Sequence, residues 1–261
     1  MRLVIDTHLH FYPFYDVGKA FAALHSNLSS SDFCQDATIV GILTESNGCH
    51  FFKQVKENPE KFQLSHFKIN FCRGAIVVKM PEYPEMYILP GRQIVTAENI
   101  ELLCLLVDCE IEDGLPARMV IKRICEQNGV PVIAWSPGKW QFKRRRIVKD
   151  LVLKHKPGSL LIGDTALRPA GWPLHGLMKL AVSKGLGVVS GSDPFPLEGE
   201  EKTMGKFGIL LEFDMNSSDL ITGLRAVLLN PATIMTCIGR RHSFFQVVSK
   251  LVRHKFRKSF S

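Results

Sequence analysis

The chain lacks the patterns that mark several common protein classes. Its seven cysteines are scattered over 261 residues, are odd in number and include no Cys-x-x-Cys pair. This argues against a disulfide framework and against a cysteine-based zinc knuckle. The sequence has no run of about 18 apolar residues that would span a bilayer, and its first residues show no signal-peptide segment. We therefore expect a soluble, cytoplasmic protein with reduced thiols.

Internal repeats, low-complexity segments and clear linkers are also missing, which favours a single domain over residues 1–261. Hydrophobic residues make up 46% of the chain and charged residues 22%, as in ordinary globular proteins. Much of the formal net charge of +8 lies in two segments, 143–146 and 240–258. No DNA- or RNA-reading motif accompanies these charges, so nucleic acid is not an expected partner. No feature predicts an oligomeric state.

Strand-like apolar runs alternate with helix-like segments along much of the chain. Helices are predicted over 116–128, 147–155 and 174–184, and they separate strands at 130–134, 160–163 and 187–190. Further strands are predicted at the N-terminus, at 37–43 and at 100–107, and residues 88–95 read as a strand pair around the turn Pro90-Gly91. This alternation indicates parallel β/α units, that is, an α/β fold.

The C-terminal segment is predicted to be mainly helical, after one more strand at 207–213. Ser217, Ser218 and Asp219 would cap a helix over 220–229, and residues 230–232 would break it and start another. Residues 243–258 form an amphipathic helix. We expect its apolar side to dock on the parent domain, so that a membrane is not an expected partner; the alternative is an amphipathic helix on a membrane surface. That apolar side consists of Phe244, Phe245, Val248, Leu251 and Val252.

The N-terminal stretch Asp6-Thr7-His8-Leu9-His10 ends an apolar strand in polar residues. Side chains alternate in a strand, so His8 and His10 point the same way and can offer two imidazoles to one ion. The alternative is that two histidines flank a leucine by chance. Other predicted strands also end in polar residues, among them Glu45, Asp164 and Asp193, and in β/α barrels such residues collect at one end.

These pieces, in this order, resemble the PHP (polymerase and histidinol phosphatase) family. The similar motifs are His-x-His at 8–10, Thr-Glu-Ser at 44–46, Leu-Pro-Gly-Arg-Gln-Ile at 89–94, Trp-Ser-Pro at 135–137 and Gly-Ser-Asp at 191–193. The resemblance spans about residues 1–195. It implies a divergent member of the metal-dependent hydrolases with a distorted TIM-like (β/α)7 barrel, here with a C-terminal helical extension from about residue 217.

The sequence departs from the family pattern at several ligand positions. Ser46 and Ser136 stand where the family has His, and Gln93 stands where it has Glu, with Glu101 in the following strand. Pro194-Phe195 replaces the residues that would carry a final His. A full three-metal cluster is therefore not expected.

The residues that keep metal-ligand character are nevertheless enough for one catalytic ion. The expected metal ligands are His8, His10, Asp193 and Glu45, and the ion is zinc or manganese, with iron as a further candidate. Asp193, Glu45 and Asp164 are the expected catalytic carboxylates, with Glu45 or Asp164 as fourth ligand or general base. Asp164 and Asp193 have an alternative role as capping or turn residues.

Two cations are candidates for substrate binding. Arg168 would clamp an anionic group as a bidentate fork, or else form a structural salt bridge with Asp164. Lys202, with Lys206, lies in the loop 194–206, which is either a lid over the site or an ordinary acidic surface loop. Core packing is expected for at least two of the three tryptophans, at 135, 140 and 172; the alternative is that they line a substrate pocket.

The function that these residues indicate is a metal-dependent hydrolase, specifically a phosphoesterase acting on a small phosphorylated substrate. The alternative is a catalytically degenerate PHP-like barrel that binds a ligand or serves as a scaffold. The surviving His8, His10 and Asp193 favour the first, and the substitutions at Ser46, Gln93 and Ser136 favour the second.

Overall fold

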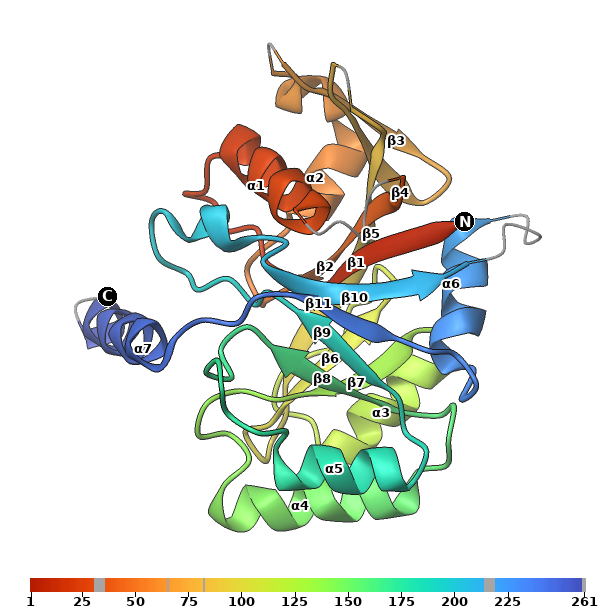
Figure 1. The fold of residues 1–261 in the computed structure, drawn as a ribbon, viewed down its shortest axis with the longest axis vertical. Helices are drawn as coiled ribbons and strands as arrows, with labels where there is room; N and C mark the ends of the chain where they lie inside the picture. The colour runs from red at the N-terminus through yellow and green to blue at the C-terminus, as the bar shows by residue number, and fades with distance from the viewer. Residues whose placement is uncertain (31–35, 65, 82, 214–218, 260–261) are drawn as a thin grey trace.

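A strongly curved sheet that nearly closes into a barrel forms the centre of the structure (Figure 1). The computed structural model describes residues 1–30, 36–64, 66–81, 83–213 and 219–259. Seven strands form the barrel wall in the order β1 (Arg2–Leu9), β2 (Thr38–Glu45), β5 (Met86–Val95), β6 (Glu101–Leu105), β7 (Val130–Ala134), β8 (Leu161–Thr165) and β9 (Val188–Gly191). This is a distorted TIM-like barrel, as the sequence predicted.

The wall strands run in one direction, with one exception. Strands β1, β2 and β5 are mutually parallel, as are β7, β8 and β9, whereas β6 pairs antiparallel with both β5 and β7. The first residue of β6 therefore lies at the end of the barrel where the other strands finish. That end is on the left in Figure 1.

The barrel closes where β9 meets β1. The Thr7 hydroxyl donates to the Ser190 carbonyl over 2.9 Å, and the Asp193 amide donates to the His8 carbonyl, also over 2.9 Å. Outside the wall, β10 (Phe207–Glu212) pairs antiparallel with β1, β11 (Thr236–Gly239) pairs with β10, and the hairpin β3 (Lys68–Cys72) and β4 (Ala75–Lys79) extends from β5.

Helices α1 (Val17–Ser29), α2 (Phe51–Glu57), α3 (Ala117–Glu126), α4 (Phe142–Lys154) and α5 (Gly176–Ser183) cover the outside of the sheet. Helix α6 (Leu220–Leu229) lies at the end of the barrel where β1 begins, and α7 (Phe244–Ser259) lies at the opposite end (Figure 1). The chain also forms the 3₁₀ turns η2 (Pro59–Phe62) and η3 (Glu200–Thr203). The Asp219 side chain caps α6 by accepting the Thr222 amide over 3.1 Å, as predicted. Ser217 and Ser218 lie outside the described residues.

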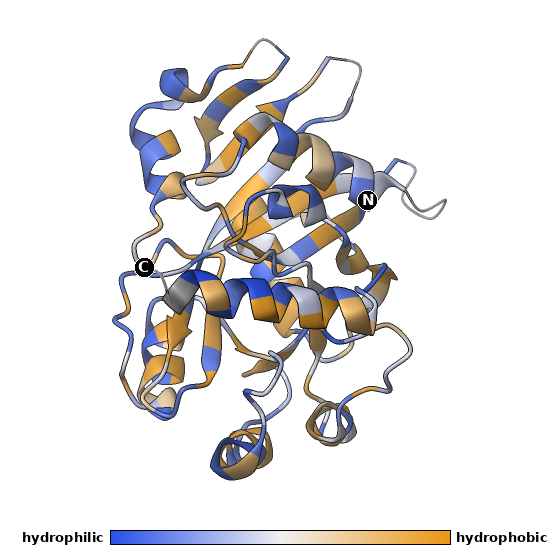
Figure 2. Ribbon diagram, turned by 90° about the vertical axis from the view of Figure 1, so that its left-hand side faces the viewer, coloured by the Kyte–Doolittle hydropathy of each residue, from blue (hydrophilic) through white to orange (hydrophobic). Residues whose placement is uncertain are grey.

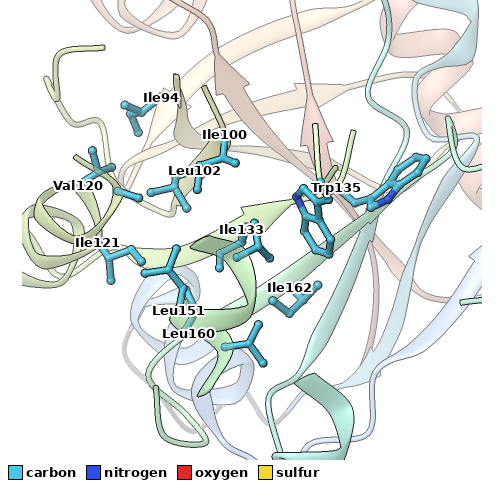
Figure 3. Close-up of a cluster of buried hydrophobic side chains, with 14 of the residues drawn as sticks. Ile94, Ile100, Leu102, Val120, Ile121, Ile133, Trp135, Leu151, Leu160 and Ile162 are labelled. Carbon is cyan, nitrogen blue, oxygen red and sulfur yellow. The ribbon is translucent and has the colours of Figure 1, made fainter. Parts of the chain in front are cut away.

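The core lies on both sides of the wall. Inside the barrel, side chains such as Ile5, Val40 and Leu103 form one cluster. Between the wall and helices α3 to α5, Ile133 and Ile162 pack against Val120, Ile121 and Leu151 (Figure 3). Full burial of each such aliphatic side chain contributes about 1.5–3 kcal/mol. Trp135 and Trp140 are buried, in line with the sequence expectation, whereas Trp172 is exposed.

Two predicted elements were wrong. Residues 88–95 belong to one continuous strand, β5, and form no turn. Gly91 is packed closely between strands β6 and β2: a Cβ there would be 3.0 Å from the Cys104 carbonyl and 3.2 Å from that of Leu43. No helix starts at residues 230–232; the chain continues into β11 instead, which adds to the free edge of β10.

The structure also bears on the expected absence of a membrane-spanning segment and of disulfides. Within these residues, no helix is both long and apolar enough to span a bilayer. The six cysteines in the described part form no disulfide, and Cys34 lies outside it.

Candidate metal centre

An extra residue in β1 orients the two histidines. Asp6 pairs with Gly41 and Leu9 with Leu43, so three steps along β1 oppose two along β2, which is a β-bulge. Before the bulge, Ile5 packs inside the barrel; after it, Leu9 packs on the outer side. Since side chains alternate, the shift turns His8 and His10 toward the interior.

The histidine side chains converge with the carboxylate of Asp193. The Nε2 atoms of His8 and His10 lie 3.1 Å apart, and each lies 3.6 Å from Oδ1 of Asp193. Both histidines are buried. In the part of the chain that the structure describes, these three residues form the group of potential ligands whose atoms lie within 4.8 Å of one another. The predicted grouping of His8, His10 and Asp193 in space is thus what the structure has.

Asp193 has an unusual backbone conformation and a carboxyl pKa that its neighbours shift. Its φ of 51° is in the left-handed region, which Asp tolerates better than most residues. Burial acts to raise the pKa of the Asp193 carboxyl, but the facing His8 and His10, together with His242, outweigh it and the pKa is lowered. Asp193 is therefore an ionised acceptor beside two imidazoles.

The donor triangle fits a divalent ion. Ligand bonds of about 2.0–2.1 Å in a tetrahedral zinc site place the ligand atoms about 3.3–3.4 Å apart, close to the separations of 3.1 and 3.6 Å observed here. Two imidazole nitrogens and one carboxylate oxygen suit zinc, manganese or iron. Three protein ligands also leave a position for water or substrate, as catalytic sites require.

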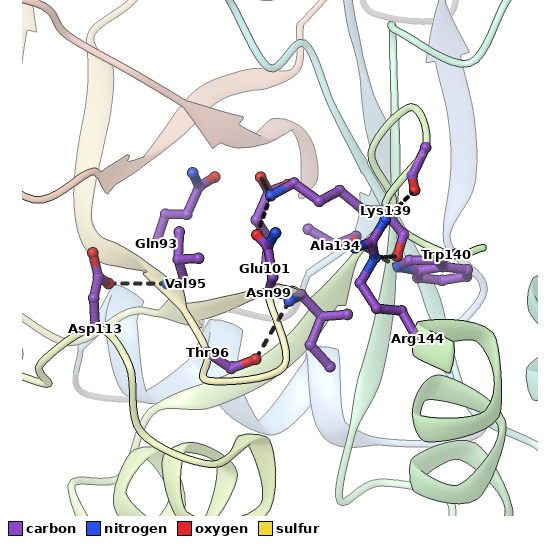
Figure 4. Close-up of polar contacts among 12 residues, drawn as sticks. Gln93, Val95, Thr96, Asn99, Glu101, Asp113, Ala134, Lys139, Trp140 and Arg144 are labelled. Atoms are coloured by element: carbon purple, nitrogen blue, oxygen red, sulfur yellow. Dashed lines mark hydrogen bonds and ion pairs between the residues drawn. The ribbon is translucent and has the colours of Figure 1, made fainter. Parts of the chain in front are cut away.

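Two further side chains reach this centre from β5 and β6. Gln93 Oε1 lies 2.9 Å from His8 Nε2. Glu101 begins β6, and its side chain points to the same side of the sheet as that of Gln93 (Figure 4). Burial, followed by the charge of Asp193, raises the pKa of Glu101, against the influence of Lys139, His8 and Ser136. A group whose pKa is raised by burial beside a ligand cluster is a candidate proton acceptor.

Lys139 and Tyr12 also lie close to these residues. Lys139 Nζ, from the loop after β7, lies 3.5 Å from Glu101 Oε1 and 2.7 Å from Asn99 Oδ1 (Figure 4). The Tyr12 ring stacks on the His10 ring with centroids 5.6 Å apart. Burial and the charge of Asp193 raise the pKa of Tyr12, so its hydroxyl keeps its proton.

Glu45 and Asp164 do not belong to this cluster, because they lie on the outer faces of their strands. Glu45 has the strand parity of Leu43, which packs in the outer cluster, and its Oε1 accepts the Phe52 amide over 3.2 Å. Burial raises the pKa of Glu45 to about 7. Asp164 has the parity of Ile162, also in an outer cluster. The roles of both residues in metal binding or catalysis stay predictions.

Arg168 uses its guanidinium within the fold. Its Nε and Nη2 donate to the two oxygens of Asp164 over 2.8 and 2.5 Å, and Nη1 donates to the carbonyls of Trp172 and Pro173. This is the salt bridge that the sequence left as an alternative, and a substrate contact of Arg168 stays a prediction. Lys202 lies on η3 with an exposed side chain, and its substrate contact is likewise a prediction.

From the sequence, Glu101 is only a glutamate in the strand after Gln93, and Lys139 and Tyr12 are not expected near the centre. The missing signal for Glu101 was strand direction: only an antiparallel β6 places the start of a strand at the mouth of the barrel. Tyr12 stands two residues after His10, a spacing that could have drawn attention to it.

The sequence matches no family model and no curated protein, whereas solved structures share its fold. PsfC from Pseudomonas syringae PB-5123 has a TM-score of 0.60 and 14% identity, over 100% of this chain and 99% of that one. The lesion-specific Endonuclease Q from Pyrococcus furiosus has a TM-score of 0.52 and 11% identity, over 91% of this chain and 58% of that one.

A second Endonuclease Q structure contains nucleic acid. It is a complex with a 27-mer duplex that has an abasic lesion at the active site, with a TM-score of 0.52 and 12% identity over 95% of this chain and 67% of that one. At these identities the likeness concerns the fold. The expectation that nucleic acid is not a partner of this chain stays a prediction.

Proposed function

We propose that the chain is a PHP-like metal-dependent hydrolase that cleaves a phosphoester at the centre formed by His8, His10 and Asp193. The observation that carries the proposal is the triangle of two imidazole nitrogens and one carboxylate oxygen at separations of 3.1 and 3.6 Å. A divalent ion there, zinc or manganese in the first place, would polarise a phosphoryl oxygen and lower the pKa of a bound water. The barrel shared with Endonuclease Q supports this reaction class by analogy.

Three neighbouring side chains would bind the substrate or transfer a proton. Lys139, beside Glu101, would hold an anionic oxygen of the substrate at the rim. Glu101, whose pKa is raised by burial, would accept a proton from the attacking water. The protonated Tyr12 hydroxyl would donate a hydrogen bond to the substrate. The loop positions of Lys139 and Tyr12 leave them at the edge of the barrel, where substrate must enter.

The experiment is a hydrolysis assay with a generic aryl phosphate and added Zn²⁺, Mn²⁺ or Fe²⁺. Asp193→Asn should lower kcat/KM by at least about 100-fold, because the ligand charge is lost. Asp150→Asn, an exposed carboxylate on α4, is the matched control and should leave kcat/KM unchanged. Equal activity of the Asp193 variant and wild type would refute the assignment. A parallel assay on an abasic duplex asks whether the substrate is small or a nucleic acid.

A degenerate barrel that only binds a ligand is the second candidate. It is favoured by Ser46, Gln93 and Ser136, none of which carries the charge or imidazole of the family ligand. Metal binding without hydrolysis of any phosphoester would support this candidate over the first.

A further inference from the structure

Helix α7 lies across the side of the molecule where the barrel strands end (Figures 1 and 2). Its inner face contacts the loops that follow two of the candidate metal ligands. Lys250 pairs with Glu200, and the His254 ring lies 5.4 Å from the Phe195 ring. At its C-terminal part, Arg257 donates to the Pro196 carbonyl and lies 4.3 Å from the centroid of the Phe14 ring. The helix is thus fixed to the barrel through one face.

The opposite face of α7 is an exposed apolar stripe, formed by Phe245, Val248, Val252 and Phe256. These side chains are 81%, 40%, 47% and 63% exposed, respectively. Their spacing of three, four and four residues places them along one line of the helix, about 16 Å long at a rise of 1.5 Å per residue. Val247 and Lys250, in contrast, are buried against the barrel. The helix therefore does not dock through the apolar side that the sequence suggested.

The charges around the stripe all have one sign. Residues 240–258 contain seven lysines and arginines and no aspartate or glutamate. On the helix, Lys255 and Arg253 flank the stripe on its two sides. Trp172, which is 49% exposed, stacks on Phe244 at the start of the helix with ring centroids 6.1 Å apart. An exposed apolar stripe flanked by cations, with a tryptophan at its edge, has the form of an interfacial helix.

We infer that α7 binds an anionic lipid surface, with the apolar stripe inserted among the acyl chains and the flanking cations at the headgroups. A second copy of the chain is a poorer occupant, because pairing two stripes would bring the flanking Arg253 and Lys255 of both copies together. Nucleic acid is also a poorer one, because the aliphatic Val248 and Val252 occupy the centre of the stripe, where phosphates would need cations and bases would need rings.

The experiment is co-sedimentation of the full chain with phosphatidylcholine vesicles, with and without phosphatidylglycerol. Wild-type protein should bind the anionic vesicles and leave the neutral ones. Phe245→Ser/Phe256→Ser should weaken binding at least about tenfold, with an unchanged melting temperature because both residues are exposed. Phe142→Ser removes an exposed phenylalanine from α4 and should bind like wild type.

Tryptophan emission gives a second measurement. Trp135 and Trp140 are buried, so a blue shift on adding anionic vesicles reports on Trp172 and should be absent from the Trp172→Phe variant. Both measurements are made without added metal and repeated on His8→Ala/His10→Ala, so they do not depend on the proposed hydrolase activity.

Two outcomes would overturn the inference: no binding of the wild type to anionic vesicles, or binding that the stripe variant leaves unchanged. If vesicles do not bind the wild type, light scattering and oligonucleotide binding identify the other occupants. Loss of self-association in the stripe variant would indicate a second copy, and loss of affinity for an oligonucleotide would indicate a nucleic acid.

Discussion

Gly191 on β9 lies so close to His8 on β1 that a Cβ added to the glycine would be 2.4 Å from both the backbone nitrogen and the Cβ of His8. The nitrogen belongs to the β1 main chain and the Cβ is bonded directly to it, so neither atom can rotate away. The absence of a side chain at residue 191 is therefore what lets β9 close against β1. The same contact sets His8 beside Asp193, two residues after the glycine.

Gly191→Ala should separate β9 from β1 and displace the imidazole of His8. We expect the affinity for a divalent ion to fall at least about tenfold and the free energy of unfolding to fall by about 1–3 kcal/mol from overpacking. Isothermal titration and urea unfolding measure the two effects. Gly176→Ala is the matched control, because a Cβ there meets nothing within 4 Å. Identical metal affinity in the two variants would contradict this account.

Gln93→Glu would place a carboxylate oxygen where the amide oxygen now lies 2.9 Å from His8 Nε2. We expect the affinity for a divalent ion to rise by about tenfold or more, since a negative ligand is added near the centre. The metal-free protein should become less stable, because Glu101 and Asp193 are already close. Gln93→Leu, which removes the oxygen, should not raise the affinity. An unchanged affinity in the glutamate variant would place Gln93 outside the metal's reach.

The barrel and three of the proposed ligands could be predicted from the sequence, but the direction in which each polar residue at a strand end points could not. Both faces of strands β2 and β8 are buried, so the alternation that separates inward from outward residues is absent from their sequences. For this reason the sequence does not distinguish Glu45 and Asp164 from His8, although these two residues face outward. The inward position of His8 itself depends on a bulge between Asp6 and Leu9 that no turn residue signals.

Long-range contacts account for the other differences. The loop 194–206 was expected to be a lid or an acidic surface loop, yet Glu200 and Glu201 are buried, and Glu200 pairs with Lys250 of α7. A partner 50 residues away cannot be read from the loop itself. Strand β11 similarly depends on the unpaired edge of β10, which only the assembled sheet presents.

The buried pair between Glu200 and Lys250 joins α7 to the barrel. Glu200→Ala should lower the free energy of unfolding by about 3–5 kcal/mol, because it leaves the buried Lys250 ammonium without its carboxylate. Glu200→Leu/Lys250→Met should recover most of that loss, since neither charge is then buried. Chemical denaturation of the three proteins measures both values. A double variant as unstable as Glu200→Ala would show that packing, and not charge, explains the effect.

His242 makes stability depend on acid pH. Burial, and then the charges of Lys250 and Lys206, lower the pKa of His242 to about 3, from an ordinary value of 6.5. Between pH 6.5 and 3 the unfolded chain therefore holds a proton that the folded chain does not. The free energy of unfolding should fall as the pH drops through this window, by up to about 1.4 kcal/mol per pH unit from this residue.

The comparison with His242→Gln isolates that contribution. Urea unfolding in the presence of a chelator, at several pH values between about 7 and about 4, should give a shallower decline in the variant than in wild type. Parallel declines in the two proteins would show that His242 is not the residue responsible.

The metal content of the purified protein shows whether His8, His10 and Asp193 hold a divalent ion. Elemental mass spectrometry of wild type should give about one ion per chain, since three ligands form one site, and His8→Ala/His10→Ala should lose it. His50→Ala/His66→Ala, which removes two exposed histidines, should retain it. No bound ion in wild type after incubation with Zn²⁺, Mn²⁺ and Fe²⁺, or equal metal in all three proteins, would show that these three residues hold no ion.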